Sequence, residues 1–478
     1  MLKRSAHVLT LAAVLTFPAL AAPPASKLTP CQVSGGGGEV NALCGTYQVW
    51  ENRAAKAGLK IGLKIVVLPA LSKRPKPDPV FFLAGGPGQA ATDLVGSGVG
   101  NPLRRDRDLV YVDQRGTGDP DRLTCELGGH EDDLQSYLGE MFPLDAVRAC
   151  REELEKTYDL KLYTTDLAMD DFDEVRTWLG YGRINLFGGS YGTRASQVFL
   201  RRHPQAVRAM VLTGVVPMDE ALPISHAAGG QRALDLLLGW CAADASCNAR
   251  FPDTARELET VLDRLAQSPV TVGVRHPVTG QPVQVRLSRN LVADGLRWLL
   301  YNAADSARLP LLVHEAATGD FTALGQASVS ARVGIVRALA NGMFFSVTCA
   351  EDIPFIDPSQ IPERTAGSFL GDYRVRQQMA ACEVWPRATI EPGHREAVRS
   401  GVPVLLISGE RDPVTPPAFA TRAARRFTHA VQVVVPFAGH GGDEPCVQEI
   451  SRKFIKQGSG AGLDTSCLKE IHLTPFVL

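Results

Sequence analysis

The sequence lacks an excess of charge of either sign. Its 478 residues include 50 lysines and arginines against 51 aspartates and glutamates, which leaves a formal net charge of −1. Proteins that bind nucleic acid or anionic membranes through their surface carry a basic excess. The charge balance therefore gives no reason to expect a nucleic-acid partner. Low-complexity segments are also missing, which excludes a largely disordered chain.

Long apolar runs are scarce as well. One run near the N-terminus, from Val8 to Leu20, follows Lys3 and Arg4 and closes with the small-x-small pattern Ala19-Leu20-Ala21. A membrane-spanning helix needs about 20 apolar residues, and this run is shorter and soon meets Pro23. The pattern predicts a signal peptide over residues 1–21, export to the periplasm or the medium, and no stable membrane insertion after cleavage.

Cysteine pairs with the two-residue spacing of common zinc sites are absent, so we expect no metal site. The cysteines are even in number, which in an exported chain favours disulfides. The ten are Cys31, Cys44, Cys125, Cys150, Cys241, Cys247, Cys349, Cys382, Cys446 and Cys467. Sequence alone does not fix their pairing. As a hypothesis we pair neighbours along the chain: 31–44, 125–150, 241–247, 349–382 and 446–467.

Short apolar runs that end in turn residues recur along the chain. Such runs are typical of strands buried on both faces of a sheet. They lie at 80–84, 109–112, 184–187, 209–213, 402–408 and 431–436. Helix-like stretches, such as 166–179 and 191–202, lie between several of them. This alternation predicts an α/β fold with a mostly parallel central sheet, preceded by antiparallel strands near 47–50 and 59–68.

The alternation breaks between about 215 and 400, where the pattern is helix-biased. We expect residues 22–214 to form the first part of the core, 215–400 an inserted, mainly helical cap, and 401–478 the second part of the core. Two independent domains are the alternative. They are disfavoured because the late strands need the first half of the sheet as a neighbour.

A candidate nucleophile stands between a predicted strand and a predicted helix, in Gly188-Gly189-Ser190-Tyr191-Gly192. Gly-x-Ser-x-Gly in this context is the pattern of a nucleophile elbow, a tight turn that presents the serine. The N-terminus of the following helix favours a developing negative charge. A chance Gly-Ser turn is the alternative, and the flanking strand and helix argue against it.

A serine nucleophile needs a base, and His440 follows a late apolar run in a glycine-bracketed loop. We expect the orienting acid after the run 402–408, where Asp412 is the first candidate because Glu410 comes too soon after the strand. Asp443 and Glu444 are further alternatives. The chain order Ser190, Asp412, His440 is that of α/β-hydrolases and differs from that of chymotrypsin- or subtilisin-type enzymes.

An oxyanion hole requires backbone N–H donors, and we expect one from Tyr191, next to the nucleophile. The loop Phe81–Gly88 is rich in glycine and follows an early strand, so Gly86 is the expected second donor, with Gly85 as the alternative. The segment Asp113–Gly118 does not match a phosphate-binding loop. We interpret it as a structural turn.

The motifs of this chain resemble those of the secreted α/β-hydrolase serine peptidases of the prolyl and tripeptidyl aminopeptidase family. They are Leu-Ala-Gly-Gly-Pro-Gly (83–88), Val-Asp-Gln-Arg-Gly-Thr-Gly (112–118), Gly-Gly-Ser-Tyr-Gly-Thr (188–193), Gly-Glu-Arg-Asp-Pro-Val-Thr-Pro (409–416) and Gly-His-Gly (439–441). The resemblance implies an α/β-hydrolase fold, a Ser-Asp-His triad, a helical cap, exopeptidase activity on free N-termini and no cofactor.

Two positions depart from the proline iminopeptidases, which usually have His before Gly-Gly-Pro-Gly and often Trp after the serine. Here these positions are Ala84 and Tyr191, which look more like the tripeptidyl branch. Such enzymes bind the substrate ammonium with acidic residues of the cap and its flanks. Glu351 is the first candidate for that anchor.

The sequence thus predicts an exported serine hydrolase, an aminopeptidase that releases one residue or a short peptide from a free N-terminus. An esterase with the same triad is the alternative. The two differ in whether the cap holds an acidic anchor for an ammonium group. A binding protein without catalysis is disfavoured because all three triad positions are intact.

Overall fold

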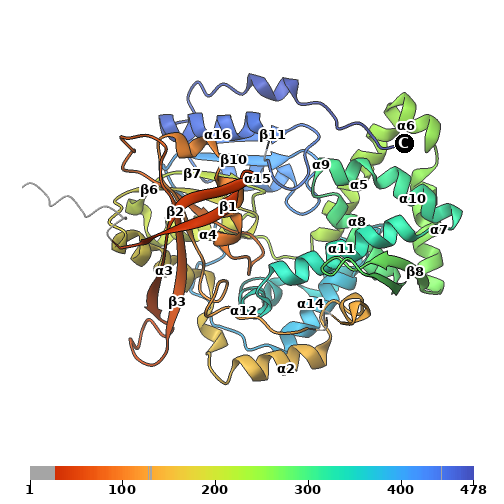
Figure 1. Cartoon of the computed structure of the whole chain (residues 1–478), viewed down its shortest axis with the longest axis horizontal. Coiled ribbons are helices and arrows are strands. Elements are labelled where there is room, and N and C mark those ends of the chain that lie inside the picture. The colour runs from red at the N-terminus through yellow and green to blue at the C-terminus, as the bar shows by residue number, and fades with distance from the viewer. Residues whose placement is uncertain (1–26, 128, 130–131, 443) are drawn as a thin grey trace, which may run out of the picture.

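The computed structural model describes residues 27–127, 129, 132–442 and 444–478 (Figure 1). The predicted signal peptide and the alternative acid Asp443 lie outside the described residues. None of the helices within these ranges is both long and apolar enough to cross a membrane.

A central sheet of nine strands organises the described part of the chain. Across the sheet the order is β1 (Thr29–Gly35), β2 (Gly38–Trp50), β3 (Lys60–Leu68), β5 (Leu109–Val112), β4 (Val80–Leu83), β6 (Ile184–Gly189), β7 (Val207–Thr213), β10 (Val404–Gly409) and β11 (Ala430–Val435). Pairing is antiparallel from β1 to β5 and parallel from β5 to β11. The predicted mostly parallel α/β sheet is confirmed.

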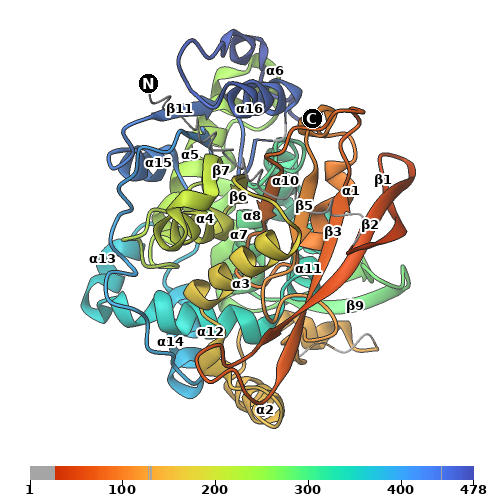
Figure 2. The same ribbon diagram turned by 90° about the vertical axis from the view of Figure 1, so that its left-hand side faces the viewer.

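Helices cover both faces of the sheet. Consecutive residues of a strand point to opposite faces, so neighbouring residues pack against different helices. Phe81 belongs to a core cluster with residues of α3 (Thr165–Trp178) and α4 (Tyr191–Arg202). Its neighbour Phe82 belongs to a second cluster with residues of α16 (Pro445–Gln457). Figure 2 shows α3 and α4 in front of the sheet. Strands covered in this way read as unbroken apolar runs, which explains the pattern in the sequence.

The remaining helices follow in chain order. They are α1 (Val95–Gly98), α2 (Leu144–Leu154), α5 (His226–Ala243), α6 (Ala245–Arg250), α7 (Thr254–Gln267), α8 (Arg289–Leu299), α9 (Ala303–Ala307), α10 (Leu309–Thr318), α11 (Thr322–Ala338), α12 (Asn341–Glu351), α13 (Ile361–Thr365), α14 (Tyr373–Val384) and α15 (Pro417–Ala424). All helices from α5 to α14 lie between β7 and β10, within the stretch that the sequence marks as helix-biased.

The first part of this insertion has a hydrophobic core of its own. Helices α5, α7, α8, α10 and α11 contribute to it together with an antiparallel hairpin, β8 (Val270–Arg275) and β9 (Pro282–Leu287), which the sequence did not predict. In Figure 1 these helices lie to the right, beside the sheet. Helices α12 and α14 instead share the main core cluster with α2. We propose that the insertion forms the cap, with the boundaries 215–400 expected above.

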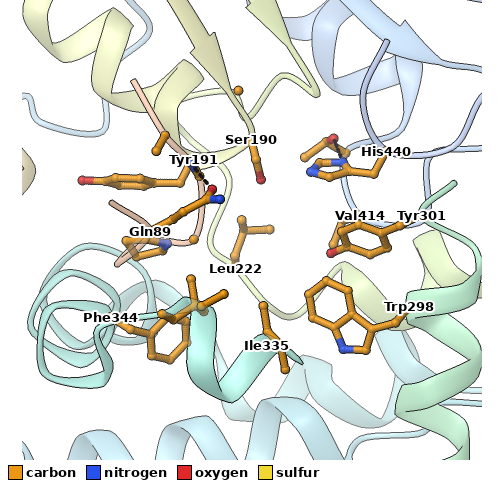
Figure 3. A pocket seen from close by; sticks show the side chains of 18 of the residues that line it. Gln89, Ser190, Tyr191, Leu222, Trp298, Tyr301, Ile335, Phe344, Val414 and His440 are labelled. Carbon is orange, nitrogen blue, oxygen red and sulfur yellow. Dashed lines mark hydrogen bonds between the residues drawn. The ribbon is translucent and has the colours of Figure 1, made fainter. Parts of the chain in front are cut away.

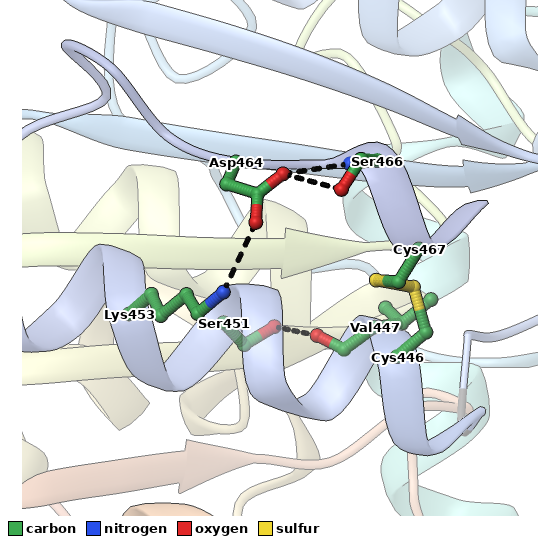
Figure 4. The surroundings of a disulfide bond; sticks show 7 residues. All are labelled: Cys446, Val447, Ser451, Lys453, Asp464, Ser466 and Cys467. Carbon is green, nitrogen blue, oxygen red and sulfur yellow. Dashed lines mark hydrogen bonds and ion pairs between the residues drawn. A yellow bond between two sulfur atoms is a disulfide. The ribbon is translucent and has the colours of Figure 1, made fainter. Parts of the chain in front are cut away.

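Five disulfides join the cysteines in the neighbour pairing, so that hypothesis is confirmed. Cys349–Cys382 joins α12 to α14. Figure 4 shows Cys446–Cys467, which joins the start of α16 to a short C-terminal 3-10 helix. An ion pair between Lys453 and Asp464, 3.4 Å long, supports the same contact. Disulfides of this number are typical of proteins that fold outside the cytoplasm.

Candidate active site

Ser190 occupies a strained turn at the end of β6. Its backbone angles are φ 54° and ψ −123°, which a non-glycine residue rarely adopts. Its amide donates a hydrogen bond of 2.9 Å to the carbonyl of Thr213 on the neighbouring strand β7. A side chain at Gly192 would place its Cβ 2.1 Å from the carbonyl oxygen of Leu83. The second motif glycine is therefore required by the close approach of helix α4 to strand β4.

His440 and Asp412 meet in the loops that follow β11 and β10. His440 Nδ1 lies 2.8 Å from Asp412 Oδ2. Asp412 is fully buried, and it also accepts hydrogen bonds from the amides of Val414 and Thr415 and from the Thr415 hydroxyl. Burial alone would raise the pKa of Asp412, but His440 and these donors hold the pKa below its usual value. The carboxylate is thus charged and directed at the imidazole.

Two further contacts determine where the imidazole lies. The amide of His440 donates a hydrogen bond of 2.8 Å to the carbonyl of Tyr301, and the two rings pack edge to face. On the other side, Gly214 has φ +64°, and a Cβ there would lie 2.9 Å from His440 Cε1. The ring is therefore held between a residue of the insertion and a residue that must be glycine.

The backbone amides of Tyr191 and Gly86 are available as donors. In the described part of the chain, the N–H groups of Tyr191 and Gly86 donate to no protein atom. The amide of Gly85 donates to Gln89 Oε1 at 3.3 Å and is thereby occupied (Figure 3). This difference favours Gly86 over Gly85 as the second oxyanion donor.

A cavity of about 660 Å³ brings the candidate residues together. Ser190, Tyr191, His440 and Gly86 all line it. Figure 3 shows Ser190 and His440 at the top, with Tyr301 and Trp298 of the insertion below His440. Apolar side chains, among them Leu222, Ile335 and Phe344, form much of the opposite wall.

Glu351 does not line this cavity. Its side chain is fully buried, and its two carboxylate oxygens accept hydrogen bonds from the amide and the hydroxyl of Thr165, each 2.7 Å long. His394 Nε2 lies 3.2 Å away on another side. The expected role of Glu351 as an ammonium anchor is therefore not supported, because its oxygens already serve the contact between α12 and α3.

The neighbouring Asp352 does line the cavity. It forms a buried ion pair with Arg194 of α4, 2.8 Å long, and accepts from the amide of Leu222 at 3.0 Å. Asp352 lies in the stretch 348–352 in which the sequence pointed to Glu351 as the first candidate, so the acid next to the chosen one lines the cavity. Sequence reasoning missed the lining residues of the insertion, which are Asp294, Arg297, Arg332 and Arg374. No motif marks them, because they come from different helices of the insertion.

The other acidic residues considered above have structural contacts. Glu410 accepts a hydrogen bond of 2.9 Å from the amide of Phe437, and Glu444 precedes the first residue of α16. Asp113 accepts from the amide and hydroxyl of Thr92. Burial raises its pKa to about 6 despite these donors. Within the described residues, no group of three or more histidine, cysteine, aspartate or glutamate side chains is arranged so that it could hold a metal ion.

Comparison with known proteins identifies the family. Residues 78–239 match a model described as the alpha/beta hydrolase fold, and residues 367–467 match one described as TAP-like protein. Serine protease Hip1 of Mycobacterium tuberculosis is 24% identical, over 92% of this chain and 90% of its own. Proline iminopeptidase of Neisseria gonorrhoeae is 32% identical over 30% of this chain and 34% of its own. The two models identify the chain as an α/β-hydrolase, and together with these relatives they support the prolyl and tripeptidyl aminopeptidase family that its motifs resemble.

This α/β-hydrolase also resembles the putative hydrolase YuaR of Escherichia coli, with 22% identity over 84% of each chain. Among solved structures, proline iminopeptidase of Mycobacterium smegmatis matches with 16% identity and a TM-score of 0.40, covering 87% of this chain and 98% of that one. An esterase from Thermogutta terrifontis matches with 14% identity and a TM-score of 0.39, covering 87% and 99%. The family models and the curated relatives, not these structures, confirm the α/β-hydrolase expected from the motifs and support an enzyme of the serine hydrolase type.

Proposed function

We propose that this α/β-hydrolase is an exported serine aminopeptidase that releases one residue or a short peptide from free N-termini. Ser190 attacks the scissile carbonyl carbon while His440 takes the hydroxyl proton, and Asp412 orients and stabilises the imidazolium. The amides of Tyr191 and Gly86 stabilise the oxyanion. His440 then protonates the leaving amine, and water activated by the same histidine hydrolyses the acyl-enzyme.

The 2.8 Å contact between His440 Nδ1 and Asp412 Oδ2 carries this proposal. It occurs beside a cavity that both His440 and the strained Ser190 line. A buried carboxylate on Nδ1 leaves Nε2 as the nitrogen that can accept a proton from the nucleophile. The positive φ of Ser190 is energetically unfavourable for a non-glycine residue. Turns that present a nucleophilic serine typically contain a residue with such a strained backbone.

The cavity supports a short substrate segment. Its volume of about 660 Å³ is within the range of pockets that enclose small ligands, roughly 300–1,000 Å³. A serine protease and proline iminopeptidases among the relatives support a peptide bond as the target. Since Asp294 and Asp352 are engaged by arginines, the exposed Glu140 becomes our candidate contact for the substrate ammonium.

A fluorophosphonate probe tests the nucleophile directly. We expect it to label the wild-type protein once, at Ser190, and to leave Ser190→Ala unlabelled. A folded wild-type protein that resists the probe would revive a non-catalytic binding role.

A matched substrate panel tests the specificity. It compares tripeptidyl and single-residue p-nitroanilides, each with a free or an acetylated N-terminus, with a simple p-nitrophenyl ester. If only the anilides with a free amine are hydrolysed, the aminopeptidase is supported. The preferred length of the peptidyl group then shows how many residues are released. If acetylation has no effect, or only the ester reacts, the protein is an esterase.

A further inference from the structure

Three arginines and one aspartate lie together in the cap wall of the cavity. Asp294 and Arg297 belong to α8, Arg332 to α11 and Arg374 to α14, and all four line the cavity. Four residues from three helices that are distant in sequence thus converge on one place. None of them has a role in the proposed triad or oxyanion hole.

The single carboxylate of this group is used mainly by one arginine. Asp294 Oδ1 accepts hydrogen bonds from Arg297 Nε at 3.3 Å and Arg297 Nη2 at 3.1 Å. Arg332 Nη2 lies 3.9 Å from Asp294 Oδ2, beyond hydrogen-bond distance. Burial alone would raise the pKa of Asp294, but the three guanidiniums outweigh it and hold the pKa below its usual value. One negative charge therefore faces three positive charges.

Arg332 and Arg374 keep buried donors without partners. Arg332 is only 3% exposed, and its Nε and Nη2 atoms are buried and make no hydrogen bond within the described residues. The same holds for Nε of Arg374, whose guanidinium lies over the ring of Phe142 with 5.2 Å to the centroid. Burial and the neighbouring Arg297 lower the pKa of Arg374 to about 10, so it remains charged at neutral pH. Buried charges and donors are costly unless a partner satisfies them.

The rest of the lining does not supply that partner. The other two carboxylates in it are Asp352, which Arg194 engages, and Glu140, which is exposed. His226 also lines the cavity, and burial followed by the charge of Arg297 lowers its pKa well below the usual value, so it is neutral. An excess of buried positive charge therefore faces the cavity.

The arginine group lies close to the reacting centre. Arg297 Nη1 donates a hydrogen bond of 3.0 Å to the hydroxyl of Tyr301. The ring of Tyr301 in turn packs against His440, with 4.8 Å between the ring centroids. One side chain, that of Tyr301, thus separates the Arg297 guanidinium from the catalytic base.

We propose that Arg297, Arg332 and Arg374 form a subsite that binds a carboxylate of the substrate, close to the scissile bond. Guanidinium groups suit this ligand because their planar donors match the two oxygens of a carboxylate. The inference rests on the proposed function, and it assigns acidic peptides as the substrate class. The carboxylate belongs either to an aspartate or glutamate side chain of the released segment or to a short leaving residue with a free C-terminus.

Isosteric substrates test the subsite. The panel consists of tripeptidyl p-nitroanilides with glutamate or glutamine at each position in turn, and of short peptides with a free or an amidated C-terminus. We expect kcat/KM to favour glutamate over glutamine at one position, or the free acid over the amide, by about ten- to hundred-fold, as for a charged hydrogen bond. A response in the glutamate and glutamine pairs identifies a side-chain carboxylate of the released segment, and a response in the free and amidated pairs identifies the C-terminal carboxylate of the leaving residue. Equal rates in every pair would overturn the subsite.

Variants assign the preference to these arginines. In Arg332→Met, the ratio of kcat/KM for the acidic substrate to kcat/KM for its neutral partner should fall toward one. In Arg332→Lys, part of this preference should return. Arg308→Met is the matched control, because Arg308 is an exposed cap arginine outside the cavity lining; it should retain the full preference. A preference that survives Arg332→Met would contradict the assignment.

A wild-type measurement covers the case in which Arg332→Met fails to fold. Glutarate should slow fluorophosphonate labelling of Ser190, whereas its uncharged diamide should not. Equal effects of the two compounds would reject the subsite. Absence of labelling without either compound would reject the proposed function instead, so the two failures are distinguishable.

Discussion

The carbonyl oxygen of Tyr301 accepts a hydrogen bond from the amide of His440, 2.8 Å long, and the two rings pack edge to face. Tyr301 follows α8 in the inserted segment, whereas His440 lies in the loop after β11. A residue of the insertion thus positions the candidate base. The insertion therefore supports the candidate active site and also forms a wall of the cavity.

Loss of the Tyr301 ring should impair catalysis. Tyr301→Ala removes the ring against which the imidazole packs, so we expect kcat for a p-nitrophenyl ester to fall by roughly ten- to hundred-fold, the usual effect of a misplaced catalytic group. Tyr301→Phe keeps the ring contact and loses only the hydrogen bond to Arg297, so its kcat should stay within a few-fold of the wild type. Equal losses in both variants would show that the ring contact is not what positions His440.

Asp412→Asn should lower kcat by on the order of 10⁴-fold, the effect known for the corresponding change in a serine protease triad. The amide cannot stabilise the imidazolium and favours the wrong tautomer. Glu410→Gln is the matched control two residues away, since Glu410 contacts the amide of Phe437 and not His440. The kcat of both variants is measured at steady state with the best substrate of the panel described under Proposed function. A Glu410 variant as inactive as the Asp412 variant would refute the choice of acid.

Asp352→Asn should destabilise the fold. Both Asp352 and Arg194 are nearly fully buried, and removal of one partner leaves an uncompensated charge, which typically costs about 3–5 kcal/mol. Urea unfolding of the mature protein measures the change. The matched control is Asp145→Asn, because Asp145 forms an ion pair with Arg148 on the surface of α2. Its free energy of unfolding should match that of the wild type.

His394 should make stability depend on pH. Its Nδ1 lies 2.5 Å from Asp166 Oδ2, and its Nε2 lies 3.2 Å from Glu351 Oε2. Burial alone would lower the pKa of His394, but the two carboxylates outweigh burial and raise the pKa to about 9. A raised pKa means that the folded state binds the proton more tightly than the unfolded state. The resulting stability is fully present below the unfolded pKa, about 6.5, and is lost as pH rises through about 9.

The size of this contribution is about 3 kcal/mol, as a shift from about 6.5 to about 9 implies. The free energy of unfolding should therefore fall between pH 6.5 and pH 9 in the wild type and fall less in His394→Gln. His429→Gln serves as the control, because His429 is exposed and bonds the carbonyl of Gly401; its profile should follow the wild type. Parallel profiles for wild type and His394→Gln would contradict the prediction.

Much of the core could be predicted because its signals are local. The strand before Ser190 and the helix after it are continuous in sequence, and the structure has β6 ending at Gly189 and α4 beginning at Tyr191. Gly188 and Gly192 are needed where β6 and α4 pack closely against each other and against β4, and the sequence shows both glycines within the motif. Asp412 and His440 follow two late strands, and parallel strands bring the loops at their carboxyl ends to one edge of the sheet.

The insertion could not be read in the same way. The hairpin β8–β9 went unpredicted, and its strands have alternating exposed and buried residues without the apolar runs of the main sheet. Glu351 looked like a loop acid beside a cysteine, yet it is the last residue of α12 and is fully buried against Thr165. Its position depends on how α12 packs on α3, which no local pattern encodes.

The sequence by itself determined the sheet and the candidate nucleophile, acid and base, because each depends on periodicity, turn chemistry or chain order, and its motifs indicated the family. The disulfide partners were only a hypothesis from sequence, and the structure decided them. Only the tertiary structure decided which cap residues line the cavity. Arg297, Arg332 and Arg374 are separated by 35 and 42 positions in the sequence and come from three helices. Their shared position follows from the packing of α8 and α11 in the separate core of the insertion and of α14 in the main core cluster, since side-chain burial there is set by contacts between distant segments.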